Sequence, residues 1–303
     1  MAKPELSHIM FKDLPLDESL QEALEDNNYV QCTPIQALSL PLLLAGRDVV
    51  GQAQTGTGKS AAFLLATLNR LMTVPVQQGK RGPFAIIMAP TRELAIQIYE
   101  DAEMLGRYTG LKFSCIYGGT GYEKQRSDLA SDVDVVIGTV GRILDFYKQG
   151  ELNLKEIEVV VLDEADRMFD LGFISDIRYL FKKMPSVTER QNLFFSATFS
   201  QRVLELAYEH MDMPEKVQIE ADNVTADKIK QYLIHVGSPD KISLLFGVLK
   251  KEQPTRTIIF VNTKRAAEEI SNYLAANDYK AGVLSGDIPQ NKRERLLGDF
   301  KDG

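Results

Sequence analysis

The sequence predicts an α/β protein built on a parallel β-sheet with helices on both faces. Three observations predict this class. Short runs of apolar and β-branched residues recur along the first 200 residues, and longer segments with apolar residues at helical spacing separate them. Continuous apolar strands that alternate with helices are typical of a sheet buried on both faces. The third observation is a glycine-rich segment, GQAQTGTGKSAAF at 51–63, between one such strand and one such helix.

Six strands can be placed in chain order on this pattern. The expected strands span 47–52, 84–90, 112–119, 134–139, 158–166 and 192–198. Helical spacing is clear in KSAAFLLATLNRLM (59–72) and TRELAIQIYEDAEMLGRY (91–108). Ligands of such sheets bind outside the carboxyl ends of the strands. The polar motifs of this chain fall at those ends, so we expect them to form one site.

A polar stretch near residue 220 predicts a domain boundary. We expect a first domain over 1–219, a linker over 220–229 and an incomplete second domain over 230–303. In the second domain the pattern predicts strands at 231–236, 257–263 and 281–286, and helices at about 239–251, 264–276 and 289–300. Half a sheet leaves an unpaired edge and a small core, so we expect residues 228–303 to be less stable than residues 1–219.

Composition indicates an ordinary globular protein. The chain has 303 residues, of which 44% are hydrophobic and 25% charged, and this length favours two domains. Two distant cysteines, Cys32 and Cys115, indicate free thiols in a reducing compartment, and the three histidines form no metal-ligand pattern. No signal peptide or membrane span is evident, so we expect a cytoplasmic protein. The net charge of −7 argues weakly against nucleic acid, although a local basic groove is compatible with it.

The glycine-rich segment nearly matches a phosphate-binding loop. The usual pattern is G-x-x-x-x-G-K-[ST], but Ala53 stands at the first glycine position. Gly56 and Gly58 let backbone N–H groups turn toward phosphate oxygens, and the following helix N-terminus favours anions. Lys59 would reach the terminal phosphates and the Ser60 hydroxyl would hold Mg²⁺. The alternative interpretation is a glycine-rich turn that caps a helix.

Two further motifs follow apolar strands. In VVVLDEAD the strand ends in acids, which is the form of a magnesium-binding segment; Asp163 would hold Mg²⁺ and Glu164 would polarise a water for attack on the terminal phosphate. The alternative is an exposed acidic turn. The segment FSAT (195–198) is weaker evidence, because small hydroxyl residues after a strand are common in turns and caps.

Taken together, these segments resemble the DEAD-box RNA helicase family. Residues 163–166 spell the motif after which the family is named, and the family's phosphate loop, A-x-x-G-x-G-K-[ST], begins with alanine as this chain's does. The family's other motifs occur in the same order as NYVQCTPIQ (28–36), PTREL (90–94), GG (118–119), T-x-G-R (139–142), SAT (196–198), IIFVNT (258–263), and Q-x-x-R at Gln290 and Arg293. The resemblance covers essentially the whole chain. It implies a RecA-like P-loop NTPase domain followed by a partial second RecA-like domain.

The resemblance implies ATP and Mg²⁺ as cofactors. It assigns ATP binding to Phe11, Gln36, Ala53, Gln54, Thr55, Gly56, Thr57, Gly58, Lys59 and Ser60. It assigns catalysis to Lys59, Asp163 and Glu164, magnesium to Ser60 and Asp163, and coupling of nucleotide to RNA to Asp166, Ser196 and Thr198. Within an adenine-reading segment over 9–37, Gln36 would bond the adenine edge and Phe11 would stack on the base. Core packing is the alternative for Phe11.

The resemblance also implies contact with the RNA backbone. The residues it assigns are Arg92, Gly118, Gly119, Thr139 and Arg142. Arginine binds phosphate bidentately and glycine permits close approach, so binding would be largely independent of sequence. Read singly, the two arginines could also be surface ion pairs. The sequence around these motifs is similar to that of bacterial RNA-degradosome helicases, and this similarity implies the degradosome's endonuclease scaffold as a partner. We expect a monomer without a membrane association.

Three departures from the family pattern matter. Val140 stands where proline is common, and Asn28 stands where glycine is usual, which is mild because asparagine tolerates a left-handed backbone. The third is that residues 229–303 contain no match to the family's later motifs, including the H-R-x-G-R-x-G-R arginines. We therefore expect an ATP-dependent RNA helicase by family whose 303-residue chain hydrolyses ATP poorly. The alternatives are an ATP-binding, RNA-contacting adaptor without turnover, and a P-loop ATPase that acts on DNA or protein.

Overall fold

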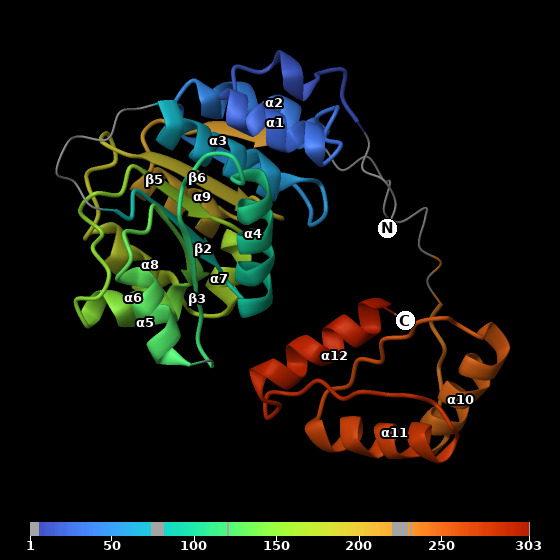
Figure 1. Ribbon diagram of the computed structural model, residues 1–303. Coiled ribbons are helices and arrows are strands. Elements are labelled where there is room, and N and C mark those ends of the chain that lie inside the picture. Colours follow the sequence, from blue (N-terminus) through green and yellow to red (C-terminus); the bar gives the residue numbers. More distant parts are fainter. Residues whose placement is uncertain (1–5, 74–81, 120, 220–229, 231, 303) are drawn as a thin grey trace. The chain divides into compact units, whose positions relative to one another are not determined.

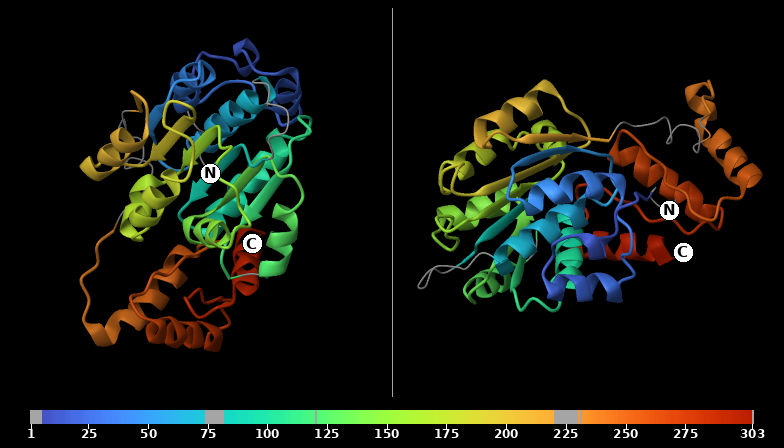
Figure 2. Two further views of the ribbon diagram at one scale, coloured as in Figure 1. Left: turned by 90° about the vertical axis from the view of Figure 1, so that its left-hand side faces the viewer. Right: turned by 90° about the horizontal axis from the view of Figure 1, so that it is seen from above.

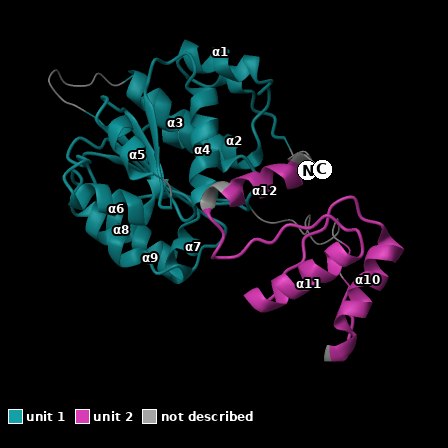
Figure 3. Ribbon diagram, turned by 60° about the horizontal axis from the view of Figure 1, so that its bottom comes forward, with its two compact units in different colours: residues 1–220 teal, residues 221–303 magenta. Residues whose placement is uncertain are grey.

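The computed structural model divides into two compact units. It describes residues 6–73, 82–119, 121–219, 230 and 232–302 (Figure 1). Unit 1 is residues 1–220 and unit 2 is residues 221–303 (Figure 3), and each is described by itself below. The linker expected at 220–229 lies outside the described residues.

Unit 1 is built on one seven-stranded sheet in which every pair is parallel. Its strands are β1 (Val49–Gln52), β2 (Ala85–Ala89), β3 (Phe113–Ile116), β4 (Val135–Thr139), β5 (Val159–Leu162), β6 (Gln191–Ser196) and β7 (Glu215–Gln218). Their order across the sheet is β3-β4-β2-β5-β6-β1-β7. The six expected strands are confirmed, as is the parallel α/β class. The edge strand β7 was not expected, because its sequence, EKVQ, buries only Val217 and so carries no apolar run.

Helices cover both faces of this sheet (Figure 2). One face carries α1 (Glu18–Asp26), α2 (Pro34–Leu44), α3 (Lys59–Thr73) and α4 (Arg92–Leu105). The other carries α5 (Tyr122–Leu129), α6 (Val140–Lys148), α7 (Ala165–Asp170), α8 (Ile174–Phe181) and α9 (Gln201–His210). Successive strand residues enter opposite cores, as Phe194 and Phe195 do. Both rings are fully buried, and each such burial contributes about 1.5–3 kcal/mol.

Unit 2 contains the three helices that the sequence predicts. They are α10 (Lys241–Glu252), α11 (Lys264–Ala276) and α12 (Gln290–Asp302). The prediction of three further strands, at 231–236, 257–263 and 281–286, is wrong. The described residues of this unit form no strand. The described residues of these apolar runs have no ladder partner, and Phe260 and Leu233 remain 92% and 84% exposed. An apolar run predicts an extended backbone, whereas a strand also needs a neighbour to bond.

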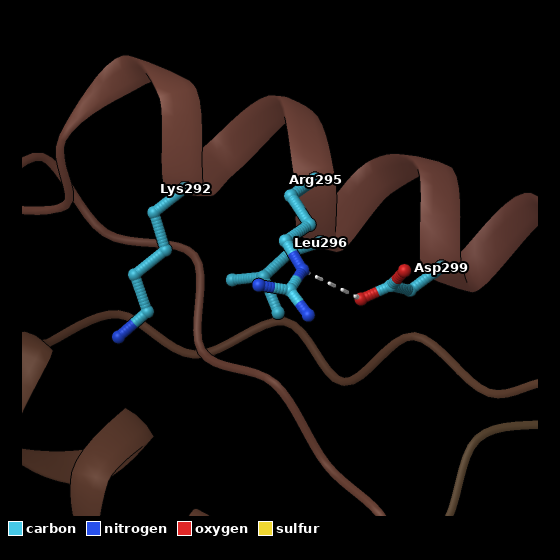
Figure 4. Close-up of a pocket in the computed structure, with 4 residues that line it drawn as sticks. All are labelled: Lys292, Arg295, Leu296 and Asp299. Atoms are coloured by element: carbon cyan, nitrogen blue, oxygen red, sulfur yellow. Dashed lines mark ion pairs between the residues drawn. The ribbon is translucent and has the colours of Figure 1, made fainter.

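Helix α12 has an open pocket along one side, lined by Lys292, Arg295, Leu296 and Asp299 (Figure 4). Arg295 and Asp299 are one helical turn apart, and their Nε and Oδ2 atoms are 3.9 Å apart. This exposed pair contributes little to stability. The pocket has no polar group buried within it by which a ligand would be recognised. Across the described ranges, none of the helices is both long enough and apolar enough to cross a membrane.

Candidate functional site

The strand order sorts the motifs of unit 1 into two neighbouring groups at the carboxyl edge of the sheet. The strands β5, β6 and β1 are adjacent, and they lead into the acidic, FSAT and glycine-rich motifs respectively. We call this group the phosphate-loop half. The strands β3, β4 and β2 are also adjacent, and they lead into the Gly118–Gly119 turn, Thr139 and Arg92. We call this group the arginine half.

The glycine-rich loop joins β1 to α3, and hydrogen bonds between its own residues hold it in shape. Gly56 and Gly58 have φ angles of 79° and 88°, a left-handed region in which glycine is favoured. The Lys59 side chain is only 5% exposed, and its Nζ donates to the Ala53 carbonyl oxygen at 2.8 Å. The ammonium therefore already has one partner inside the loop, and two of its three N–H donors remain for other acceptors. The other loop residues, Gln54 and Thr55, are exposed, Thr57 donates to the Gln54 carbonyl, and Ser60 is half-buried at the start of α3.

Gln36 lies beside this loop, and the side chains of both Gln36 and Phe11 already have partners. The Gln36 amide oxygen accepts from Thr33 N at 2.8 Å, and its nitrogen donates to the Gly58 carbonyl oxygen at 3.0 Å. Gln36 thus joins the first turn of α2 to the glycine-rich loop. Phe11 is 1% exposed and packs edge-on against Tyr29, with ring centroids 5.9 Å apart. In this structure Phe11 is packed in the core, as the alternative describes, and its role in stacking on a base stays a prediction.

The acidic motif begins where β5 ends. Asp163 is 3% exposed, and its Oδ1 accepts from Glu164 N at 2.9 Å. Burial raises the pKa of Asp163 to about 6, and the charge of Lys59 opposes that rise. Glu164 has a left-handed backbone with φ of 51°, a conformation that costs about 1–3 kcal/mol and persists where the surrounding structure imposes it. The two adjacent carboxylates are therefore held in different environments, one buried and one partly open.

The FSAT segment contacts the acidic motif directly. Thr198 Oγ1 donates to Asp166 Oδ2 at 3.1 Å, and Asp166 N donates to Ser196 Oγ at 3.3 Å. The three residues expected to couple nucleotide and RNA therefore form one hydrogen-bonded cluster. Gln52, which the motifs did not indicate, adds a link: its amide donates to the Ala197 carbonyl at 3.2 Å and so ties the end of β1 to the same segment. One indication of this role was visible in the sequence, because Gln52 lies immediately before Ala53 in the glycine-rich segment.

In the arginine half, Arg92 packs directly on the Gly118–Gly119 turn. Arg92 is the first residue of α4, whose N-cap, Thr91, accepts from Leu94 N at 3.3 Å. Gly119 has a φ of 86°, and a Cβ atom at this position would lie 2.7 Å from Arg92 Cζ. A Cβ atom at Gly118 would lie 3.5 Å from Arg92 Nη2, an ordinary contact distance. The turn therefore needs glycine specifically at 119.

Arg142 lies in the first turn of α6 and is held by aromatic rings. Its Cζ is 5.0 Å from the Tyr122 ring centroid and 5.6 Å from that of Phe146. Its Nη1 lies 3.4 Å from Gln125 Oε1. Among the described residues Arg142 forms no ion pair, so the ion-pair alternative does not describe it. Thr139, the last residue of β4, is the N-cap of this helix but makes no side-chain capping bond.

Metal ligands are sparse in the described part of the chain, which contains no group of three or more His, Cys, Asp or Glu side chains able to hold an ion. Asn28 has the left-handed backbone that asparagine tolerates, with φ of 58°.

Comparison with known proteins gives consistent matches. The family described as DEAD/DEAH box helicase matches residues 33–206, and the helicase conserved C-terminal domain matches residues 240–303. The chain is 54% identical to the ATP-dependent RNA helicase RhlB of Pseudoalteromonas atlantica and 53% identical to that of Idiomarina loihiensis, covering all of this chain and 72% of each relative. A crystal structure of a DEAD box protein from the hyperthermophile Methanococcus jannaschii aligns with a TM-score of 0.64 at 32% identity. That alignment covers 97% of this chain and 78% of the other.

Proposed function

The chain belongs to the DEAD/DEAH box helicase family, and from that premise we propose that it acts as an ATP-dependent RNA helicase that remodels RNA duplexes in RNA turnover. One observation carries the proposal most strongly. The Asp166–Ser196–Thr198 cluster lies at the carboxyl ends of β5 and β6, strands that stand between β1 with its glycine-rich loop and the strands of the arginine half, so it adjoins both proposed binding regions. A generic ATP-binding domain does not need such a link.

In the phosphate-loop half, we propose that backbone N–H groups of residues 55–60 bind the phosphates of ATP. Lys59 donates to a phosphate oxygen with an N–H group that its bond to the Ala53 carbonyl does not use, which gives a charge-assisted contact. The adenine binds near Gln36, whose side-chain amide stays beside the loop because it donates a hydrogen bond to the Gly58 carbonyl oxygen. The helix dipole of α3 adds to the attraction for anions.

A divalent cation fits this half because Asp163 is buried next to Glu164 and Asp166, both of which raise its pKa, so the acids lack sufficient positive charge around them. We propose that Asp163 and Ser60 hold Mg²⁺ together with the nucleotide. Mg²⁺ supplies the charge that offsets the phosphate oxygens. Glu164, less buried than Asp163, accepts a proton from the attacking water, and Lys59 stabilises charge on the terminal phosphate.

In the arginine half, we propose that the RNA backbone contacts Arg92, Gly118, Gly119, Thr139 and Arg142. The two guanidiniums contribute charge, and the turn at Gly119 permits close approach of a phosphate. These groups contact phosphate and sugar rather than base edges, so binding is independent of sequence. This local charge offsets the acidic average of the chain.

We further propose that the 303-residue chain binds ATP but turns it over slowly. Its sequence contains no segment like the family's H-R-x-G-R-x-G-R arginines, and a catalytic arginine typically contributes about 10³–10⁵ in rate. The second candidate is an ATP-binding and RNA-contacting adaptor, in which the rate of ATP hydrolysis falls to zero. An ATPase assay on this chain with and without RNA tests the point: weak, RNA-insensitive turnover supports it, and robust RNA-stimulated turnover excludes it.

The similarity to RhlB proteins also suggests a cellular setting. We propose a monomer in the cytoplasm whose partners are RNA and the endonuclease scaffold of the RNA degradosome. Sedimentation of the chain alone tests the monomer. Titration with the purified scaffold tests the partnership, and no heat of binding at micromolar concentrations would count against it.

A further inference from the structure

Gln125 is a buried amide whose hydrogen bonds connect two separate parts of the arginine half. It lies in α5, a helix of largely polar sequence, yet it is only 6% exposed. Its Nε2 donates to the Tyr117 carbonyl oxygen at 3.1 Å, and its Oε1 accepts from Tyr117 N at 3.0 Å. One side chain therefore bonds both backbone groups of the residue that precedes the Gly118–Gly119 turn.

The same amide oxygen also faces Arg142. The distance from Arg142 Nη1 to Gln125 Oε1 is 3.4 Å, so Oε1 is shared between a backbone N–H after β3 and a guanidinium on α6. The Tyr122 ring, one helical turn earlier in α5, stacks on Phe146 with centroids 4.6 Å apart and lies under Arg142. Helix α5 thus places the glycine turn and Arg142 at a fixed separation.

Only an amide can make these bonds. The Tyr117 backbone presents one donor and one acceptor, and glutamine is long enough to meet both while keeping a second lone pair for Arg142. A carboxylate would lose the donor, and an aliphatic side chain would lose every bond. Because Gln125 is buried, each backbone group that it leaves unpaired is shielded from water, which makes the loss costly.

We propose that Gln125 is a positioning residue for RNA binding, which sets the spacing between the Gly118–Gly119 turn and Arg142. The proposal rests on the function proposed above, in which both elements contact the RNA backbone. Gln125 itself touches no phosphate. It acts by holding two phosphate-contacting groups in register, so that consecutive backbone phosphates can bind both at once.

The test measures RNA affinity of the 303-residue chain with Gln125→Leu, using fluorescein-labelled oligouridine at several salt concentrations. We expect RNA affinity to fall about tenfold, because Arg142 is no longer held where it can make a charge-assisted contact with phosphate. We also expect the slope of log affinity against log salt to fall by about one phosphate contact, because Arg142 is released. The affinity for ATP stays unchanged, because the phosphate-loop half lies on other strands. Gln149→Leu, the same change at an exposed glutamine at the end of α6, is the matched control.

Two further variants separate positioning from general damage. In an Arg142→Ala background, Gln125→Leu should lower RNA affinity less than it does in the unaltered chain, since only its effect on the glycine turn remains. Gln125→Glu keeps the acceptor and should give an intermediate loss of RNA affinity even if the leucine variant folds poorly. Wild-type affinity and salt slope in Gln125→Leu, or full additivity with Arg142→Ala, would overturn the positioning role. Failure of the unaltered chain to bind RNA would instead overturn the proposed function, and this proposal with it.

Discussion

Substitution of Gly119 by alanine should damage RNA binding through Arg92, while the same change at Gly118 should not. At Gly119 the backbone is left-handed, with φ of 86°, and a Cβ atom would lie 2.7 Å from Arg92 Cζ. At Gly118 the φ is not in that region, and the nearest atom, Arg92 Nη2, is 3.5 Å away. Two neighbouring glycines therefore form a matched pair in which only Gly119 has a left-handed backbone and would press a side chain against Arg92.

The magnitude follows from two separate effects. A left-handed alanine costs about 1–2 kcal/mol of folding free energy, which corresponds to a decrease in melting temperature of about 2–8 °C for a domain of this size. The guanidinium of Arg92 must also move, because it and the new methyl group cannot occupy the same space. A charge-assisted hydrogen bond to phosphate contributes about 1.5–3 kcal/mol, so RNA affinity should fall about 10- to 150-fold. Gly118→Ala should stay within about 0.5 kcal/mol in stability.

The assay is fluorescence anisotropy of labelled single-stranded RNA, with melting temperature measured on the same samples. Arg92→Ala provides the reference for complete loss of the guanidinium. Gly119→Ala should reproduce its RNA affinity, and the double variant should be little worse than either one, because both remove the same contact. Equal RNA affinities for Gly118→Ala and Gly119→Ala would show that the left-handed glycine does not control Arg92. A Gly119→Ala protein with the same melting temperature as the unaltered protein would count against the backbone cost.

Three other predictions follow from the same geometry. Glu164→Gln should abolish residual ATP hydrolysis but keep ATP binding, since the amide cannot accept the water's proton; phosphate release and equilibrium dialysis separate the two. Thr198→Val removes the donor to Asp166, so ATP should no longer change RNA affinity, whereas either ligand alone should bind normally. Burial lowers the pKa of His210 below its usual 6.5, so the unfolded chain takes up a proton first and stability falls as the pH drops through about 6.5. His210→Phe should remove that loss in urea titrations at pH 7.5 and pH 5.5; an unchanged pH dependence would contradict this cause.

The sequence predicted the strands of unit 1 well because their apolar runs reflect burial on both faces. It missed β7, whose four residues bury only Val217 at the sheet edge. It predicted three strands in unit 2 that are absent from the described residues of that unit, because an apolar run such as 257–263 carries no information about a pairing partner. Strand prediction was therefore reliable where burial, rather than pairing, is the determining property.

The site was predicted in its motifs but not in its contacts. The cluster of Asp166 and Thr198 could be expected, because both follow strands of one sheet. The bond of Lys59 to the Ala53 carbonyl, and the burial of Phe11, depend on how the loop and the N-terminal segment pack, which spacing alone does not specify. The helix sequence YEKQRSDL does not indicate a role for Gln125, because that role arises only when the loop after β3 brings Tyr117 beside it.

We propose that one sheet edge carries two separable regions, one for ATP and one for RNA. The decisive measurement is the ATP affinity of the 303-residue chain, determined with a fluorescent ATP analogue for the unaltered protein, Lys59→Ala and Arg142→Ala. Lys59→Ala should weaken ATP binding at least about tenfold through loss of a charged phosphate contact. Arg142→Ala should leave ATP affinity unchanged. Retained ATP binding in Lys59→Ala, or an equal loss in Arg142→Ala, would show that the two regions are not separate.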